Sequence, residues 1–283
     1  MSNPIVLTTV AEVDTWAAQE KTPIAAVLTM GALHEGHAEL ARFAKAHTPS
    51  GTRMIATIFV NPTQFNSASD LESYPRDLDS DLATLHSAGV DAVFVPTVSE
   101  IYPNGLEVNP PMEPGLVGDV LEGQARPGHF RGMLTVVQRL LTITHADFSF
   151  FGEKDFQQLT LVKAMVEYTK MPIEIVGVPT VRDEFGLALS SRNRRLSTKG
   201  VELARLIPLA MQKATEVFRA SGSVSDAETA GKNILMKSGQ FEIEYFEIRS
   251  NDLVSAPTPE SARIFVAASL EEVRLIDNLE IAK

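Results

Sequence analysis

The chain contains no cysteine among its 283 residues. This absence excludes disulfide frameworks, zinc sites built on thiolates and cysteine nucleophiles. It also suits the reducing cytoplasm, where disulfides are rare. We therefore expect a cytoplasmic protein whose chemistry is carried by other side chains.

Long apolar runs are missing as well. No apolar segment reaches the roughly 20 residues that a helix needs to cross a bilayer. The N-terminal sequence also lacks the charged and apolar regions that together mark a signal peptide. The sequence therefore predicts a soluble chain that does not contact membranes.

Basic residues are fewer than acidic ones, with 25 Lys and Arg against 36 Asp and Glu, for a formal net charge of −11. This balance argues against a surface that binds nucleic acid over its whole extent. An anionic small molecule is still possible, but it needs a local cluster of donors. The hydrophobic fraction of 44% allows a real core. At this length we expect one large domain or two unequal ones.

Short apolar runs of strand length alternate with helical periodicity through the first two-thirds of the chain. The runs are nearly continuous, which is typical of parallel strands covered on both faces. We predict strands at residues 25–29, 54–60, 92–95, 148–151 and 173–178, and helices at residues 37–47, 78–88, 133–145 and 156–168. This alternation predicts a doubly wound α/β domain that binds ligands at the carboxyl ends of its strands.

The pattern changes after about residue 182. Ser197 and Thr198 favour the start of one long helix over residues 199–220, and Ser225 or Asp226 favour the start of a second. Alternating apolar and polar residues then predict a small, largely antiparallel sheet. Its strands are expected at residues 242–249, 263–270 and 272–278.

We place a domain boundary near residues 183–186, which divides the chain into residues 1–184 and 185–283. Residues 102–132 are rich in proline and glycine and have weak periodicity. They predict a long functional loop or an irregular excursion.

The first chemical motif, TMGALHEGHAEL at residues 29–40, lies where a predicted strand passes into a helix. Gly31 and Gly36 permit backbone shapes that a side chain would block. His34 and His37 can face the same way beside the exposed N–H groups of the helix start, an arrangement that receives phosphate. Two alternatives are a pair of polar caps and a two-histidine metal site without a nearby third ligand.

The second motif, IFVNPTQF, also ends a predicted strand. Asn61 and Gln64 are amides on a turn fixed by Pro62, and they can bind a carboxylate or a hydroxyl group. The alternative is that Asn-Pro is only a turn.

The third motif, FFGEKDFQQL, follows another strand and opens another helix. Lys154 supplies a cation, Asp155 can accept from a sugar hydroxyl, and Gln157 and Gln158 add amides. The alternative is a solvated cap at the start of a helix.

The fourth motif, LALSSRNRRLS, combines hydroxyl groups with a guanidinium group. Ser190, Ser191 and Arg192 suit phosphate oxygens, whereas Arg194 and Arg195 could be plain surface charge. In a chain of net charge −11 such a cluster indicates a local anion site.

A fifth stretch, RPGHFRG, adds basic side chains inside the loop-rich region. Its Arg126, His129 and Arg131 are candidates for a flap that closes over the site.

The chain resembles the pantothenate synthetase (pantoate:β-alanine ligase) family of the HxGH nucleotidyltransferase superfamily. The resemblance is carried by the order and spacing of five motifs: MGALHEGH, FVNPTQF, RPGHFRG, GEKDFQQL and LALSSRN. The resemblance runs from about residue 29 to residue 197. It implies a Rossmann-like nucleotide domain, a smaller C-terminal α+β lid domain and a homodimer. The chain departs from the family at Leu28, where proline is usual, and at Phe185, where aspartate is usual.

The resemblance also implies an activity. It is the ATP-dependent condensation of (R)-pantoate with β-alanine to pantothenate, AMP and diphosphate, through an enzyme-bound pantoyl adenylate and with Mg²⁺, in the biosynthesis of the coenzyme A precursor. Two other interpretations stay open. One is a nucleotidyltransferase acting on phosphopantetheine or glycerol phosphate, in which the nucleotide stays on the product. The other is a nucleotide-binding regulatory module without catalysis.

Site residues are carried over by motif position. The resemblance assigns ATP binding to Met30, Gly31, Ala32, Leu33, His34, Glu35, Gly36, His37, Gly152, Glu153, Lys154, Asp155, Val181, Leu189, Ser190, Ser191 and Arg192. The implied catalytic residues are His37, His34, Lys154 and Arg192. Pantoate is assigned to Gln64 and Gln158, β-alanine to Gln64, and the surroundings of magnesium to Asp81. We expect His37 to donate a hydrogen bond to the α- or β-phosphate, either neutral or as the imidazolium.

Overall fold

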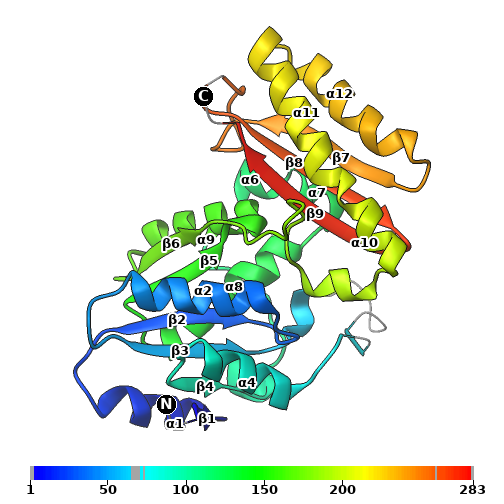
Figure 1. Cartoon of the computed structure of the whole chain (residues 1–283). Coiled ribbons are helices and arrows are strands. Elements are labelled where there is room, and N and C mark those ends of the chain that lie inside the picture. Colours follow the sequence, from blue (N-terminus) through cyan, green and yellow to red (C-terminus); the bar gives the residue numbers. More distant parts are fainter. Residues whose placement is uncertain (1–2, 65–70, 73, 259, 282–283) are drawn as a thin grey trace.

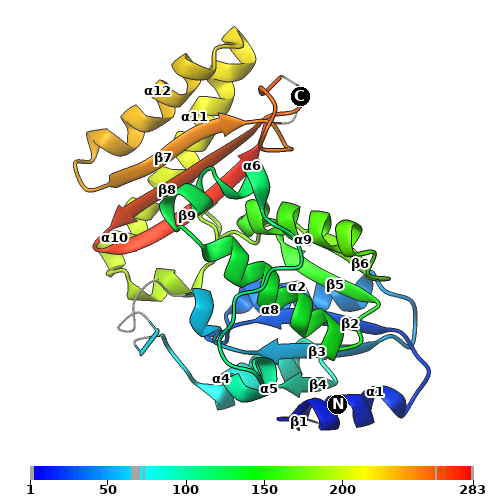
Figure 2. The same cartoon turned by 180° about the vertical axis from the view of Figure 1, so that it is seen from behind.

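A six-stranded parallel sheet organises the larger part of the chain. The computed structural model describes residues 3–64, 71–72, 74–258 and 260–281 (Figures 1 and 2). The strand order is β1-β4-β3-β2-β5-β6, and every neighbouring pair is parallel. The strands are β1 (Ile5–Leu7), β2 (Ile24–Thr29), β3 (Arg53–Ile58), β4 (Ala92–Phe94), β5 (Phe148–Gly152) and β6 (Glu174–Val178).

Helices cover both faces of this sheet, which confirms the predicted doubly wound α/β architecture. On one face, α2 (Glu35–Ala46) buries three alanines and α4 (Leu78–Ser87) buries Leu85 in a core with Ala25 and Val27. On the other, α1 (Val10–Ala18), α8 (His129–Ile143) and α9 (Phe156–Thr169) pack against Ile24 and Ala26. Alternate residues of β2 thus enter different cores, which explains its continuous apolar sequence.

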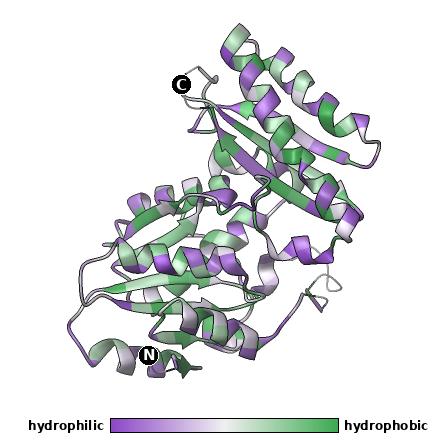
Figure 3. Cartoon of the chain, viewed as in Figure 1, coloured by the Kyte–Doolittle hydropathy of each residue, from purple (hydrophilic) through white to green (hydrophobic). Residues whose placement is uncertain are grey.

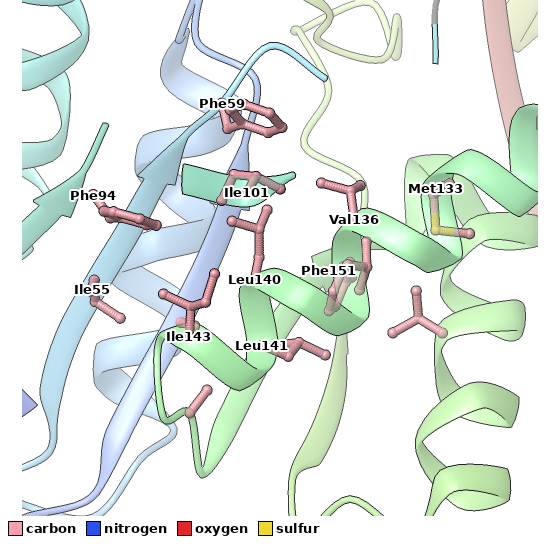
Figure 4. Close-up of a cluster of buried hydrophobic side chains, with 14 of the residues drawn as sticks. Ile55, Phe59, Phe94, Ile101, Met133, Val136, Leu140, Leu141, Ile143 and Phe151 are labelled. Carbon is pink, nitrogen blue, oxygen red and sulfur yellow. The ribbon is translucent and has the colours of Figure 1, made fainter. Parts of the chain in front are cut away.

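Helix α8 supplies much of the second core. Figure 4 shows Leu140 and Ile143 of this helix beside Ile55 of β3 and Phe94 of β4. Hydrophobic colour follows the strands, whereas hydrophilic patches mark the outward sides of the surrounding helices (Figure 3). Because these strands pair in parallel, the carboxyl ends of β2, β3, β5 and β6 lie at one edge of the sheet.

Several elements were not predicted. The N-terminal β1 was missed, as was α1, which begins at a capping box formed by Thr9 and Glu12. Residues 102–132 contain short helices as well as loop. Short helices described before β7 include α5 (Val98–Ile101), α6 (Gly115–Gly118), α7 (Glu122–Ala125) and the 3-10 turns η1 (Pro62–Gln64) and η2 (Glu153–Asp155). The last residue of the predicted FVNPTQF motif, Phe65, lies outside the described residues.

The C-terminal part forms a three-stranded antiparallel sheet of order β7-β8-β9, as predicted, and helices share its hydrophobic core. Its strands are β7 (Glu242–Arg249), β8 (Arg263–Leu270) and β9 (Val273–Glu280), and its helices are α10 (Thr198–Ala204), α11 (Leu206–Ser221) and α12 (Val224–Lys237), after the 3-10 turn η3 (Ser191–Arg195). Phe246 and Ile264 lie in its own hydrophobic core. Together with the first sheet, this arrangement confirms the expected fold class. Within the described residues, no helix has the length and hydropathy needed to cross a membrane.

The single long helix expected over residues 199–220 is two helices, so that prediction was wrong. Helix α10 ends at Ala204, and α11 begins at Leu206. Pro208 lacks the N–H group that a continuous helix would need to donate to the carbonyl of Ala204. Proline is accepted instead in the first turn of a new helix.

Helix α12 also begins earlier than predicted. Its N-cap is Ser223, whose Oγ accepts from the backbone N–H of Asp226 at 3.2 Å, and neither Ser225 nor Asp226 has that role. A hydroxyl group two residues upstream competes successfully for the same free N–H groups.

An ion pair joins the two sheets at their boundary. Arg182 donates to both carboxylate oxygens of Asp277 on β9, at 2.7 and 2.9 Å, and the Asp277 side chain is almost fully buried. Burial is the main influence on Asp277 and raises the pKa of its carboxyl, whereas Arg182 opposes this rise. We propose the division into residues 1–184 and 185–283 as the domain boundary, with this pair as one of the links across it.

Replacing Arg182 by alanine is expected to lower the free energy of unfolding by about 3 to 5 kcal/mol, because it leaves Asp277 buried without its partner. Denaturant unfolding measures the change. The double variant Arg182→Ala/Asp277→Asn should recover part of the loss, because the buried charge is then removed. Arg42→Ala, which breaks exposed pairs with Glu35 and Glu39, should leave the unfolding midpoint nearly unchanged. An Arg182→Ala variant as stable as its parent would contradict the assignment.

Candidate active site

A cavity of about 330 Å³ opens at the carboxyl edge of the parallel sheet. Strand order reverses between β2 and β5, and such a switch point is where doubly wound folds bind ligands. The loops after β2, β3, β5 and β6 line the cavity, and residues of η3 and β9 close one side. Four of the sequence motifs therefore meet in one place.

The loop after β2 has a backbone shape that its sequence allows. Gly31 has a φ of +82°, and a Cβ there would lie 2.9 Å from a carboxylate oxygen of Asp81. Asp81 accepts hydrogen bonds from the N–H groups of Ala32 at 3.0 Å and Leu33 at 2.7 Å. The buried carboxylate thus holds the loop that carries the histidines.

The two histidines begin α2 and contact each other. His34 is the N-cap, and its Nδ1 accepts from the N–H of Gly36 at 3.1 Å. The Nδ1 of His37 accepts from the N–H of His34 at 3.3 Å, and the ring centroids lie 4.2 Å apart. A neutral imidazole whose Nδ1 accepts carries its proton on Nε2. Both histidines are therefore helix caps on one side of the ring and N–H donors on the other.

Burial keeps these rings neutral. It is the main cause that lowers the pKa of His37 to about 3, with further contributions from His34, Lys154 and Arg194. Burial likewise lowers the pKa of His34 to about 4, helped by Arg194 and Lys154. Of the two protonation states considered for His37, the structure of the free protein favours the neutral one.

Cations approach the histidines from two other loops. Lys154 in η2 lines the cavity, with its Nζ 3.6 Å from Asp155. Arg194, which the sequence left as possible surface charge, donates to the carbonyl of Leu33 at 2.9 Å. It therefore ties η3 to the histidine loop.

The Ser-Ser-Arg segment also reaches the cavity. Ser190 is the N-cap of η3, and its Oγ accepts from the N–H of Arg192 at 3.3 Å. Ser191 and Arg192 line the cavity beside it. The cavity thus gathers N–H, O–H and cationic donors, a set that suits phosphate oxygens.

Amides line the other end of the cavity. Asn61 is buried, with its Oδ1 accepting from the hydroxyl of Tyr102 at 2.8 Å and its Nδ2 donating to Oε1 of Gln64 at 3.0 Å. This chain of hydrogen bonds occupies the oxygen of Gln64 and leaves its NH₂ group as the donor. Gln158 also lines the cavity. Gln157 lines it too, but its side chain is buried and bound to the backbone of α7 and of the residues before it.

The proposed flap reaches the cavity with two of its three basic residues. Arg126 donates to the carbonyl of Gln64 at 2.9 Å and lies 3.3 Å from Nε2 of His129. Both line the cavity. Arg131 turns away and pairs with Glu113 on the surface.

Most of the residues assigned to ATP, pantoate or magnesium from the sequence lie around this one cavity. The assigned residues that line the cavity are Met30, Gly31, His34, Gly36, His37, Gln64, Gly152, Lys154, Asp155, Gln158, Val181, Leu189, Ser190, Ser191 and Arg192. Five do not line it. Ala32 and Leu33 are buried within the loop, Asp81 lies beneath them, Glu35 pairs with Arg42, and Glu153 contributes its carbonyl to a contact with Asn278.

Several cavity residues were not anticipated. Glu122, Tyr245, Asp277 and Asn278 line the cavity, and three of them come from the C-terminal sheet. Glu122 accepts from the hydroxyl of Tyr245 at 2.7 Å and from Arg274 at 2.6 and 2.9 Å. Glu122 lies within the predicted functional loop of residues 102–132, whereas no motif surrounds the other three, so no local sequence signal placed those at the site.

The site offers no ready cage for a metal ion. Among the described residues, no group of three or more histidine, aspartate or glutamate side chains could hold one. Asp81 is occupied by two backbone N–H groups, and Glu122 and Asp277 are paired with arginines. The two-histidine metal alternative therefore gains no third ligand from the described part of the chain.

The buried histidines predict a loss of stability in acid. In the unfolded chain each titrates near pH 6.5, whereas burial lowers the pKa of His129, like that of His34, to about 4 and that of His37 to about 3. Below pH 6.5 the unfolded chain takes up protons that the folded chain does not, so stability falls from pH 6.5 to about 4 for His34 and His129 and to about 3 for His37. The unfolding temperature, followed by calorimetry, should fall less steeply in His37→Gln than in the parent. Equal slopes would contradict the neutral, buried assignment.

Comparison with known proteins gives consistent matches. The family model described as pantoate-beta-alanine ligase matches residues 5–280. A pantothenate synthetase of Cereibacter sphaeroides is 46% identical over 284 residues, covering 98% of this chain and 100% of the relative. One of Mycolicibacterium smegmatis is 46% identical over 258 residues, covering 91% of this chain and 80% of the relative.

Solved structures agree with these matches. The pantothenate synthetase of Thermus thermophilus has a TM-score of 0.89 and 40% identity, covering 99% of this chain and 100% of that one. The pantoate-beta-alanine ligase of Francisella tularensis, in a complex with beta-gamma ATP and beta-alanine, has a TM-score of 0.78 and 34% identity, covering 98% of both chains.

Proposed function

Because the chain belongs to the pantoate-beta-alanine ligase family, we propose that (R)-pantoate and ATP react in its cavity to form pantoyl adenylate, which then reacts with β-alanine. The enzyme condenses pantoate with β-alanine at the expense of ATP, giving pantothenate, AMP and diphosphate through an enzyme-bound pantoyl adenylate. One observation above all supports placing both substrates in this cavity. The histidine loop, Lys154 and the segment containing Arg192 line one cavity with the amides of Gln64 and Gln158.

The first step brings two anions together. A pantoate carboxylate oxygen forms a bond to the α-phosphorus of ATP, and the bond from that phosphorus to the bridging oxygen breaks, with its electron pair leaving on diphosphate. Near a protein surface two like unit charges about 4 Å apart repel by about 4 kcal/mol. Lys154 and Arg192 offset this repulsion, and the neutral N–H donors of His34 and His37 stabilise charge on the phosphate oxygens.

The second step needs position more than charge. The neutral amine of β-alanine attacks the acyl carbonyl of the adenylate, the amide bond forms, AMP leaves with the electron pair of the ester bond, and the amine proton passes to solvent. The NH₂ group of Gln64 and the amide of Gln158 hold pantoate, and Gln64 also lies near β-alanine. The protein supplies no nucleophile, so alignment of bound reactants provides the remaining acceleration.

Adenosine binds on the far side of the same cavity. Residues 152–155 and 189–192 hold the ribose and the triphosphate, and the backbone of Val181 contacts adenine. Met30 and Gly31, which precede the histidines, line the same cavity. The loop geometry held by Asp81 supports this arrangement, because it keeps the helix N-terminus directed at the phosphates.

Magnesium is proposed to enter with ATP. The described cavity residues do not fit a protein cage for the ion, since Glu122 and Asp277 are paired with arginines and Asp155 with Lys154. Asp81, which lies outside the cavity, is bound to backbone N–H groups. Mg²⁺ in nucleotide sites commonly keeps water and phosphate ligands, and it would neutralise phosphate charge there. The placement of magnesium near Asp81 stays a prediction.

We also propose an oligomeric state and a cellular location for the protein. A homodimer is expected and can be checked by light scattering of the purified protein. A cytoplasmic location agrees with a chain that has no cysteine to oxidise.

An assay for AMP tests the proposed function. The protein is incubated with pantoate, β-alanine and ATP, and each is omitted in turn. AMP should appear only with all three, whereas exchange of labelled pyrophosphate into ATP should need pantoate but not β-alanine. A product that retains the nucleotide would indicate another transferase of the superfamily. ATP binding without pantoate-dependent exchange would indicate a regulatory module.

A further inference from the structure

The side chain of Asn278, on β9 of the C-terminal sheet, reaches the backbone that carries Lys154. Its Nδ2 donates to the carbonyls of Glu153 and Lys154, both at 2.8 Å. Its Oδ1 accepts from Nη1 of Arg263 at 2.6 Å, and the residue is only 3% exposed. A buried amide from one sheet thus spans to the turn after β5 of the other.

The partners fix the orientation of this amide. A guanidinium group only donates and carbonyl oxygens only accept, so the reversed amide would place like groups against each other at all three contacts. Arg263 is itself held over the ring of Phe156, with Cζ 3.9 Å from the centroid, and lies 3.5 Å from Glu280. The backbone N–H of Asn278 donates to Asp277 at 2.7 Å. The amide therefore belongs to a rigid network.

The turn that receives these bonds is continuous with α9 at one end and receives the Asn278 amide on its backbone. It is the three-residue η2, and no side chain caps its start. Its Lys154 lies close enough to both histidines to lower their pKa values. The position of the Lys154 backbone limits where its ammonium group can lie in the cavity.

We propose that Asn278 is a positioning residue that holds Lys154 in its productive place when the C-terminal sheet is docked on the nucleotide domain. The inference rests on the proposed function, because Lys154 is taken to bind the triphosphate. It assigns to β9 a part in catalysis that no motif indicated. A misplacement of about 1 Å can cost about 10²-fold in rate, so the effect should be measurable.

Two substitutions of Asn278 test this. Asn278→Ala removes all the side-chain bonds, whereas Asn278→Asp keeps an oxygen for Arg263 and loses both donors to the turn. Each should lower kcat/KM for ATP by about 10- to 100-fold, measured by pantoate-dependent pyrophosphate exchange. The Asp variant keeps the proposal testable if the Ala variant fails to fold. Ile248→Val, a buried change in the core of the same domain, controls for loss of stability alone.

The decisive measurement combines Asn278→Ala with Lys154→Met. If Asn278 acts through Lys154, the double variant should be little worse than Lys154→Met, because the two effects are not additive. The inference is overturned if the losses multiply, or if the Asn278 variants match Ile248→Val in kcat and KM per folded enzyme. A parent enzyme without pantoate-dependent exchange would instead refute the proposed function.

Discussion

Replacing His37 by alanine should lower turnover of the adenylation step by about 10²-fold or more and leave the fold intact. The Nδ1 of His37 is occupied by the N–H of His34, so its Nε2–H is the donor that can reach phosphate. Removing one preorganised donor to a developing charge typically costs 10²- to 10³-fold, about 3 to 4 kcal/mol. Pyrophosphate exchange measures the step, and calorimetry checks that the variant remains folded.

Amide substitutions refine this test. Glutamine can place its NH₂ group near the position of Nε2, so His37→Gln should recover part of the activity. Asparagine reaches only the position of Nδ1, so His37→Asn should preserve the cap and not the rate. His47→Ala is the matched control, because this histidine lies at the other end of α2, stacked on Phe43. Equal activity of His37→Ala and the parent would remove the assigned role.

The strands that carry the site could be predicted because their sequences are simple. Strands β2 and β3 are buried on both faces, so continuous apolar runs mark them without any need for periodicity. The three-residue β1 has Ile5 and Val6 exposed and gives no such signal. The signal for α1 was present in the Thr9–Glu12 capping box, which was overlooked.

The site itself could be predicted only as far as motifs extend. Loops after parallel strands meet at one edge, so His37 and Lys154 could be placed together because each follows a predicted strand of the same parallel sheet. Asn278 and Tyr245 reach the same cavity through docking of a second sheet, which no local pattern encodes. The structural role of Asp81 could not be predicted either. Its sequence position does not reveal that its oxygens are bound to backbone N–H groups of the loop.

Replacing Lys154 by methionine should lower kcat/KM for ATP by about 10²- to 10³-fold. Methionine is similar in length but carries no charge, so the repulsion between pantoate and the triphosphate loses one of the groups that offset it. Lys154→Arg should recover part of the rate, limited by the larger planar group. Lys163→Met, an exposed change on α9, should have no effect on the kinetics.

A second measurement shows whether Lys154 acts on the histidines as well as on ATP. The positive charge of Lys154 helps to lower the pKa of His37, so Lys154→Met should raise that pKa in the free protein. The rise should be partial, because burial is the larger cause and is unchanged. NMR titration of the imidazole resonances detects the shift. An unchanged His37 titration together with the parent rate would show that the ammonium group faces neither the histidines nor the triphosphate, and the electrostatic arrangement proposed for this cavity would then be wrong.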